Sequence, residues 1–251
     1  MDCYIINLDR DKERWNVISQ QFTLSGFNVL RVSAVNGKEL TKEELTDFSP
    51  WRYFLFYGRP AMRGEIGCYF SHIKTLKTFL DTEAEHALIC EDDVVPKPEL
   101  PEVLAAALKY SDRWDLLRLN AVRQTKGKSV IELPHQYHLC CDLKTASGTG
   151  SYLLNRKAAE LILKKLRQMF LPLDVAMFYG FPIGIKEVTV QPFPVVLNES
   201  FYKDTTITGR KERYPFFSPA VLRYLTVLPY KVISRTVRKI ERIARAVFFK
   251  K

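Results

Sequence analysis

The sequence predicts an α/β fold with one main domain followed by a basic, helical tail. Its 251 residues are 47% hydrophobic and 12% aromatic, which is typical of a folded globular protein. Short apolar runs alternate with segments whose apolar residues recur every three to four positions, as strands and helices alternate in α/β proteins. One such run, residues 87–90, leads directly into three consecutive acidic residues.

The N-terminal elements predict a βαβ unit. Residues 4–8 are an apolar run, and Trp15, Ile18 and Phe22 follow at helical spacing before Gly26 ends the helix. Residues 27–35 predict the second strand. A right-handed crossover through the helix would make the two strands parallel neighbours.

The remaining elements follow the same two periods as far as residue 196. Residues 38–60 show no clear period, with five aromatic residues close together over residues 51–57, and no element is assigned there. Residues 188–196 favour strand, but Pro192 and Pro194 predict an edge strand or an extended loop. The other predicted elements are helices over 63–80, 100–108 and 156–169, and strands over 87–90, 114–119 and 145–154.

The C-terminal segment differs from the rest in charge. Residues 209–251 hold 12 Lys and Arg against 2 Asp and Glu, while residues 1–208 hold 26 of each. After Pro229, apolar residues recur every three or four positions with basic residues between them, which is typical of a helix lying on an anionic membrane surface. The sequence therefore predicts a main domain over 1–208 and a membrane-associating tail over 209–251. A neutral body without a nucleic-acid motif argues against nucleic acid as a partner.

Cysteine usage and hydropathy predict a cytoplasmic protein. The five cysteines are odd in number and form no CxxC pair. The apolar N-terminal run leads straight into charged residues, unlike a secretory signal, and no stretch reaches the roughly 18 to 20 apolar residues of a membrane span.

The acidic cluster Glu91, Asp92 and Asp93 is the main candidate site. Ligands of open α/β sheets collect at the carboxyl ends of strands, and this cluster follows the buried run over 87–90. Three adjacent carboxylates repel one another unless a cation or hydrogen-bond donors compensate them. Oxygen ligands suit Mg²⁺ or Mn²⁺. A plain acidic turn before Pro96, with solvated or paired carboxylates, is the alternative.

An ordered set of motifs resembles glycosyltransferase family 25, which includes bacterial lipooligosaccharide galactosyltransferases and collagen galactosyltransferase domains. The resemblance covers approximately residues 2–208. Its motifs are Asn7-Leu8-Asp9-Arg10 with Arg14, Gly64-Glu65-Ile66-Gly67-Cys68 leading to Ser71-His72, Leu88 to Val94, Gly148-Thr149-Gly150-Ser151-Tyr152 and Leu171-Pro172-Leu173-Asp174.

The resemblance implies a GT-A type, Rossmann-like domain that binds a UDP-sugar. It implies that Glu91 and Asp93 correspond to the two acids of the DxD-type motif, with Asp93 the stronger metal ligand because Glu91 replaces an Asp. A divalent metal, Mn²⁺ or Mg²⁺, is the expected cofactor. Donor-binding residues are then expected among Asn7, Arg10, Ser71, His72, Glu91 and Asp92.

Asp174 is the expected catalytic base, because it matches the family's Pro-x-Asp motif and an inverting transfer needs a carboxylate to take the acceptor's proton. Glu65 and Asp115 are less favoured. Simpler interpretations remain open: Asp174 as a helix N-cap, Arg10 as a solvated helix residue and His72 as a structural histidine.

The expected function is thus an inverting, metal-dependent hexosyltransferase, and specifically a β-galactosyltransferase. UDP-galactose is the expected donor, and a lipid-linked oligosaccharide of lipooligosaccharide or lipopolysaccharide the acceptor. The tail would hold the enzyme peripherally on the cytoplasmic face of the bacterial inner membrane. The alternatives are a catalytically silent, membrane-bound scaffold and a transferase with another UDP-sugar.

Overall fold

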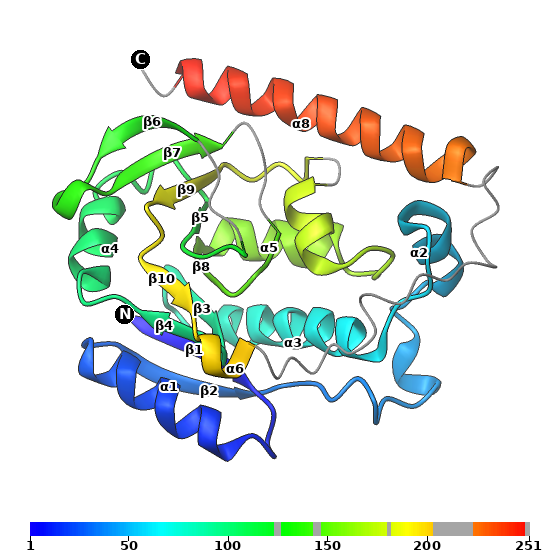
Figure 1. Ribbon diagram of the computed structural model, residues 1–251, viewed down its shortest axis with the longest axis horizontal. Helices are drawn as coiled ribbons and strands as arrows, with labels where there is room; N and C mark the ends of the chain where they lie inside the picture. Colours follow the sequence, from blue (N-terminus) through cyan, green and yellow to red (C-terminus); the bar gives the residue numbers. More distant parts are fainter. Residues whose placement is uncertain (123–126, 143–146, 180–181, 203–222, 249–251) are drawn as a thin grey trace.

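The computed structural model describes residues 1–122, 127–142, 147–179, 182–202 and 223–248 (Figure 1). Its described strands form an eight-stranded mixed sheet in the order β2-β1-β3-β8-β5-β9-β7-β6, with a separate β10-β4 pair. The strands are β1 (Asp2–Asn7), β2 (Asn28–Ser33), β3 (His86–Glu91), β4 (Val94–Pro96), β5 (Leu116–Arg118), β6 (Gly127–Glu132), β7 (His138–Asp142), β8 (Ser151–Asn155), β9 (Glu187–Gln191) and β10 (Val195–Leu197).

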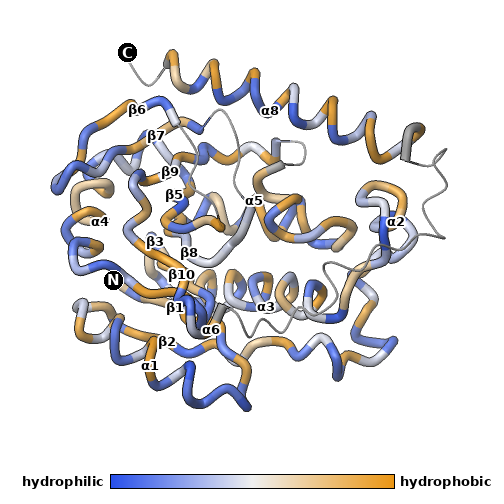
Figure 2. The backbone as a smooth tube through the Cα atoms, viewed as in Figure 1, coloured by the Kyte–Doolittle hydropathy of each residue, from blue (hydrophilic) through white to orange (hydrophobic). Residues whose placement is uncertain are grey.

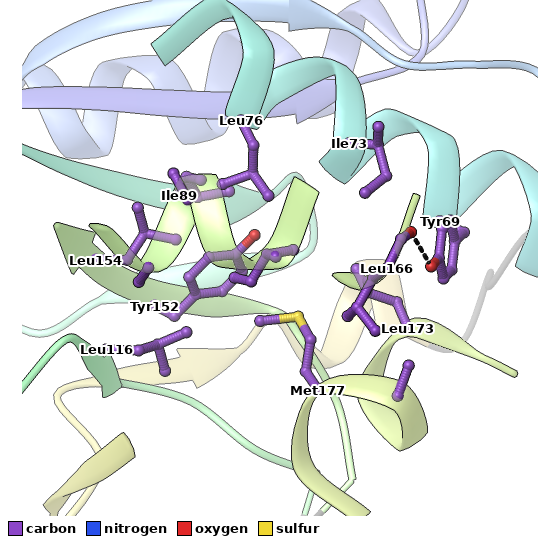
Figure 3. Close-up of a cluster of buried hydrophobic side chains, with 14 of the residues drawn as sticks. Tyr69, Ile73, Leu76, Ile89, Leu116, Tyr152, Leu154, Leu166, Leu173 and Met177 are labelled. Atoms are coloured by element: carbon purple, nitrogen blue, oxygen red, sulfur yellow. Dashed lines mark hydrogen bonds between the residues drawn. The ribbon is translucent and has the colours of Figure 1, made fainter. Parts of the chain in front are cut away.

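Helices cover both faces of the sheet (Figure 1). On one face, α3 and α5 join strand side chains in a core that includes Ile89, Tyr152 and Met177 (Figure 3). On the other, α1 and α4 pack over a second core around Trp114. The helices are α1 (Lys12–Leu24), α2 (Pro50–Tyr57), α3 (Arg63–Leu80), α4 (Leu100–Leu108), α5 (Arg156–Lys165), α6 (Glu199–Tyr202) and α8 (Leu228–Phe248), with shorter turns η1 (Glu43–Leu45), η2 (Pro134–Gln136), η3 (Val175–Tyr179) and η4 (Arg223–Val227).

The predicted α/β fold is confirmed, beginning with the N-terminal βαβ unit. Strand β1 pairs in parallel with both β2 and β3, and the register sets Ile6 beside Glu91. Strand β8 runs antiparallel to β3 and β5, which makes β5 parallel to β3. The carboxyl ends of β1, β3 and β5 therefore meet the start of β8 at one edge of the sheet.

Three sequence interpretations need correction or completion. Strand β9 is internal, between β5 and β7, and not an edge strand, because it ends at Gln191 and leaves both prolines outside its ladder. The unassigned residues 38–60 contain η1 and α2. The predicted strand over 145–154 is observed only from residue 151, as β8; residues 147–150 form the loop before it, and 145 and 146 lie outside the described part of the chain.

The predicted C-terminal helix is observed as α8, which lies along β7 and η3 (Figure 1). Its buried side chains are Ser234, Arg238, Arg242 and Ala246, each one turn from the next. Apolar residues, including Ile233 and Ile240, face outward instead. Residues 209–222 of the predicted tail lie outside the described residues.

Candidate active site

Two cavities meet at the acidic cluster. The β1 pocket, of about 130 Å³, opens between β1, the loop after β2 and the start of α3. The β8 pocket, of about 370 Å³, opens between the end of α2, the loop before β8 and the turn before η3. Both are lined by Cys68, Glu91 and Asp93. Two substrates bound side by side would therefore meet at these residues.

Asp92 is held firmly on the β1 side. The Asn7 amide donates to its Oδ2 at 2.7 Å, and Arg14 Nη1 lies 3.3 Å from its Oδ1. Burial raises the pKa of Asp92 in spite of these two partners. Asn7 is itself fully buried and accepts hydrogen bonds from Arg31 through Oδ1. Asn7 and Asp92 thus form a polar brace that fixes the cluster to β1.

Asp93 has the environment expected of a cation ligand. Its Oδ1 is buried and has no hydrogen-bond partner among the described residues. Burial, followed by the charges of Glu91 and Asp92, raises the pKa of Asp93 to about 7. A carboxylate left this way is costly unless a positive charge compensates it. Its surroundings therefore fit a bound divalent metal.

Glu91 ends a buried hydrogen-bonded chain. Tyr152 OH lies 2.8 Å from His72 Nδ1, and His72 Nε2 lies 3.3 Å from Glu91 Oε1. Thr149 Oγ1 donates to the same oxygen at 2.7 Å. Donor atoms of Cys68, His72 and Glu91 also lie within 4.8 Å of one another, a second set able to hold an ion. His72 therefore positions Glu91, either through their hydrogen bond or through an ion that both would bind.

The loop after β2 crosses α3 closely enough to require glycine. A Cβ on Gly67 would lie 2.5 Å from Val35 O and 2.7 Å from Gly37 N. Ser71 closes the same crossing: it accepts from Val35 N at 2.8 Å and donates to Gly67 O at 2.7 Å. Ser71 lines the β1 pocket, but its hydroxyl is used in shaping the wall.

Asp174 lines the β8 pocket just before η3. Its carboxylate accepts from Val175 N at 2.8 Å and from Gly148 N at 3.2 Å, which ties it to the loop before β8. Glu65 lines the same pocket, but Arg59 and Tyr53 engage its carboxylate.

Asp115 lies at the other edge of the sheet. It precedes β5, at the end opposite the acidic cluster, and its carboxylate contacts Lys157 Nζ at 3.1 Å and Lys186 N at 2.7 Å. The geometry thus separates Asp115, but not Glu65 or Asp174, from the two pockets.

Arg10 also lines the β1 pocket, beside Lys38, and its Nε lies 3.7 Å from Asp11 Oδ1. The predicted site residues that line this pocket are Arg10, Ser71, His72, Glu91, Asp92 and Asp93, with Asn7 behind them. Sequence reasoning missed Arg59 and Lys38, which lie in the segment without a clear period. It did not anticipate the contact of Thr149 with Glu91.

The geometry agrees with comparisons to known proteins. The family model described as "Glycosyltransferase family 25 (LPS biosynthesis protein)" matches residues 1–177. A "Glycosyltransferase 25 family member" of Aedes aegypti is 33% identical over 121 residues, covering 45% of this chain and 20% of that protein. "Procollagen galactosyltransferase 2" of Homo sapiens is 30% identical over 167 residues, covering 63% of this chain and 26% of that protein. The matches thus span about a quarter or less of these relatives' lengths.

Solved structures show weaker similarity. A197 from STIV aligns with a TM-score of 0.42 at 13% identity, over 75% of this chain and 80% of its own. A glycosyltransferase involved in the glycosylation of the major capsid of PBCV-1 aligns with a TM-score of 0.40 at 11% identity, over 75% of this chain and 79% of its own. The family match, which covers most of the chain and contains the acidic cluster, decides the assignment: the protein belongs to glycosyltransferase family 25.

Proposed function

We propose that the protein is an inverting, metal-dependent galactosyltransferase that uses UDP-galactose and a saccharide acceptor. The single observation that carries this proposal is the meeting of two cavities at Glu91 and Asp93, because group transfer requires two substrates to share one reaction centre. The names of the procollagen galactosyltransferases support galactose as the sugar.

The β1 pocket is the proposed donor site. Arg10 and Lys38 line it and supply positive charge for a diphosphate. The Gly37 and Gly67 crossing lets backbone form the wall, because a Cβ on either glycine would clash with the backbone of the other segment. Asn7, Ser71, His72 and Asp92 shape this site by holding the residues around it.

Asp93, with Glu91, is the proposed ligand pair for Mn²⁺ or Mg²⁺. The unpartnered, buried Oδ1 of Asp93 and its raised pKa support this choice over a plain acidic turn. Such a metal, when bound, supplies positive charge to the diphosphate leaving group. His72 and Thr149 fix the orientation of Glu91 beside it.

Asp174 is the proposed general base in the β8 pocket. Backbone N–H groups donate to both of its oxygens and orient the carboxylate, which would accept the proton of an acceptor hydroxyl through a further lone pair as that hydroxyl attacks the anomeric carbon. Glu65 is a weaker candidate, because its ion pair with Arg59 already occupies the carboxylate.

The acceptor is proposed to be a lipid-linked oligosaccharide of the lipooligosaccharide type, reached at the cytoplasmic face of a bacterial inner membrane. Hydrophobic and hydrophilic residues alternate along α8 (Figure 2). Its exposed apolar residues support a peripheral contact: Val232, Ile233 and Ile240 are 55%, 52% and 63% exposed. Exposed Lys239 lies beside them and suits anionic headgroups. No helix in the described ranges has the length and apolar character to span a bilayer.

The experiment that tests this function measures UDP release and sugar transfer from a panel of UDP-sugars, with Mn²⁺ and then with EDTA. UDP-galactose should be consumed only with the metal. Asp93→Asn, which keeps the side-chain size, should lower turnover at least a hundredfold while the circular dichroism spectrum is unchanged. Full turnover in EDTA or by this variant contradicts the metal role; a folded protein that turns over no donor supports a silent scaffold.

A further inference from the structure

A third cavity continues the β8 pocket toward α8. This α8 pocket, of about 250 Å³, shares Tyr57, Ser147 and Asp174 with the β8 pocket. Its remaining lining comes from α2, η3 and the first turns of α8, namely Phe56, Leu171, Val175, Tyr230, Lys231, Ser234 and Arg235. An acceptor longer than one sugar would therefore have a path away from Asp174.

Aromatic rings form one wall of the α8 pocket. Phe56 and Tyr230 have centroids 5.1 Å apart, tilted by 51°, and Phe56 also contacts Phe170 at 5.9 Å. Phe56, Tyr57 and Tyr230 are each only partly buried, so ring surface remains at the cavity. Pyranose rings present apolar C–H faces that pack on such rings.

Two basic residues also line the α8 pocket. Lys231 and Arg235 lie one turn apart on α8, and both line the cavity. Lys231 Nζ lies 5.6 Å from the Tyr57 ring centroid, which places the cation at the aromatic wall. The first turn of α8 has no acidic residue, so the carboxylate that lines this cavity is that of Asp174, at the end shared with the β8 pocket. An anionic group would find compensation here, at the end of the cavity supplied by α8.

We propose that the α8 pocket is a subsite for an anionic sugar of the acceptor, a saccharide unit that carries a phosphate or carboxylate group. The sugar ring packs against Phe56 and Tyr230, and its anionic group is bound by Lys231 and Arg235. This inference rests on the proposed function, because it extends the acceptor site that contains Asp174. It adds a specificity: the enzyme selects a charged, oligomeric acceptor and not a single neutral sugar.

The test uses two probes, a glucose trisaccharide and the same trisaccharide with a phosphate monoester on its reducing-end sugar. Calorimetry with the full chain, UDP and Mn²⁺ should show the phosphorylated probe binding about tenfold more tightly. Lys231→Gln with Arg235→Gln should remove this preference and leave the affinity for the neutral probe unchanged. Lys239→Gln, an exposed α8 residue outside the cavity lining, is the matched control.

Tyr230→Leu tests the aromatic wall, because leucine keeps an apolar side chain without the ring. Both probes should lose about fivefold in affinity. Equal affinity of the wild type for the two probes, or a preference that survives the double variant, overturns the proposal. So does a wild type that binds neither probe.

Two further measurements distinguish an acceptor subsite from a failed donor reaction and from a membrane contact. Release of UDP from the donor without any acceptor should be the same in the wild type and the variants. A wild type that releases no UDP counts against the proposed function. The calorimetric test of the subsite is independent of that result, because binding does not require turnover. Phosphatidylglycerol vesicles test a headgroup as the source of the anion. If the double variant binds vesicles more weakly but still prefers the phosphorylated probe, Lys231 and Arg235 contact the membrane. That result contradicts the subsite.

Discussion

At the scale of single residues, the acidic cluster shows how three adjacent carboxylates acquire different roles from their surroundings. Asp92 forms an ion pair with Arg14 and accepts a hydrogen bond from the Asn7 amide, whereas Asp93 has a buried oxygen with no hydrogen-bond partner among the described residues. Sequence spacing located the cluster and its place after a buried strand. It did not divide the roles, because the partners of Asp92 come from residues about 80 positions away.

Asp174→Asn tests the proposed base. Asparagine has one acceptor oxygen and keeps the hydrogen bond from either Gly148 N or Val175 N, so the fold should be retained, but the amide cannot take a proton. We expect kcat to fall by about 10² to 10⁴ with little change in the KM of the donor. The matched variant Glu65→Gln is expected to affect stability through Arg59 more than kcat. A full kcat for Asp174→Asn, measured by UDP release with acceptor, would remove it as the base.

Glu187 is the buried centre of a second charged cluster. Its Oε2 lies 2.9 Å from Arg242 and 4.0 Å from Arg238, and its Oε1 lies 3.8 Å from Arg118. Burial alone raises the pKa of Glu187, but these three guanidinium groups outweigh it and leave the pKa below its usual value. The carboxylate is therefore charged in the folded protein and compensates three cations.

Glu187→Gln should lower the free energy of unfolding by about 3 kcal/mol at neutral pH, or about 6 to 12 °C in Tm. The pKa of Glu187 is lower in the folded protein than in the unfolded chain, where it is about 4.3. The extra stability of the wild type over the variant is therefore fully present above pH 4.3 and is lost as pH falls through the folded-state pKa. The difference in Tm should hold from pH 7 to about 5 and then shrink toward pH 3. Thermal unfolding at each pH measures it; an unchanged difference at pH 3 would argue against a charged Glu187.

At the scale of elements, α8 joins the body through the side of the helix that the sequence assigned to solvent or lipid. Arg238 donates to Met177 O at 2.6 Å, and Arg242 donates to Phe178 O at 3.1 Å. Arg118, which also faces Glu187, donates to Gly148 O at 3.2 Å. The helix is thus connected through Glu187 to the loop that holds Asp174. Periodicity predicted the amphipathic helix, but the partner that selects its inner face, Glu187, lies in another element.

The outward apolar residues of α8 make the membrane proposal testable. Ile240→Glu places a negative charge on a side chain that is 63% exposed, so the fold should be unaffected. Binding to phosphatidylglycerol vesicles in a sedimentation assay should fall about tenfold, because a charged group replaces an inserted one. Leu24→Glu, at an exposed leucine on α1, is the control and should bind as the wild type does. Equal loss in both variants would indicate a general charge effect.

At the scale of the whole molecule, the sequence predicted the half of the sheet that carries the β1 pocket better than the other half. Strands β1 and β3 are continuous apolar runs, and both were identified from their composition. Strand β6, at the far edge of the sheet, has only exposed and half-buried residues and carried no such signal. The internal place of β9 could not be predicted either, because neighbouring prolines end the strand without interrupting it.

The proposed base also makes the stereochemical outcome testable. In the proposed single displacement, the donor lies in the β1 pocket and Asp174 activates an acceptor in the β8 pocket, so the acceptor attacks the anomeric carbon from the face opposite the leaving diphosphate. One displacement along that path inverts the α-linked sugar of UDP-galactose to a β-galactoside. Proton NMR of the first product formed should show only the large anomeric coupling of a β linkage. An α-linked product would require a second displacement or attack from the donor face, and would remove Asp174 from the base role because its carboxylate lies on the acceptor side.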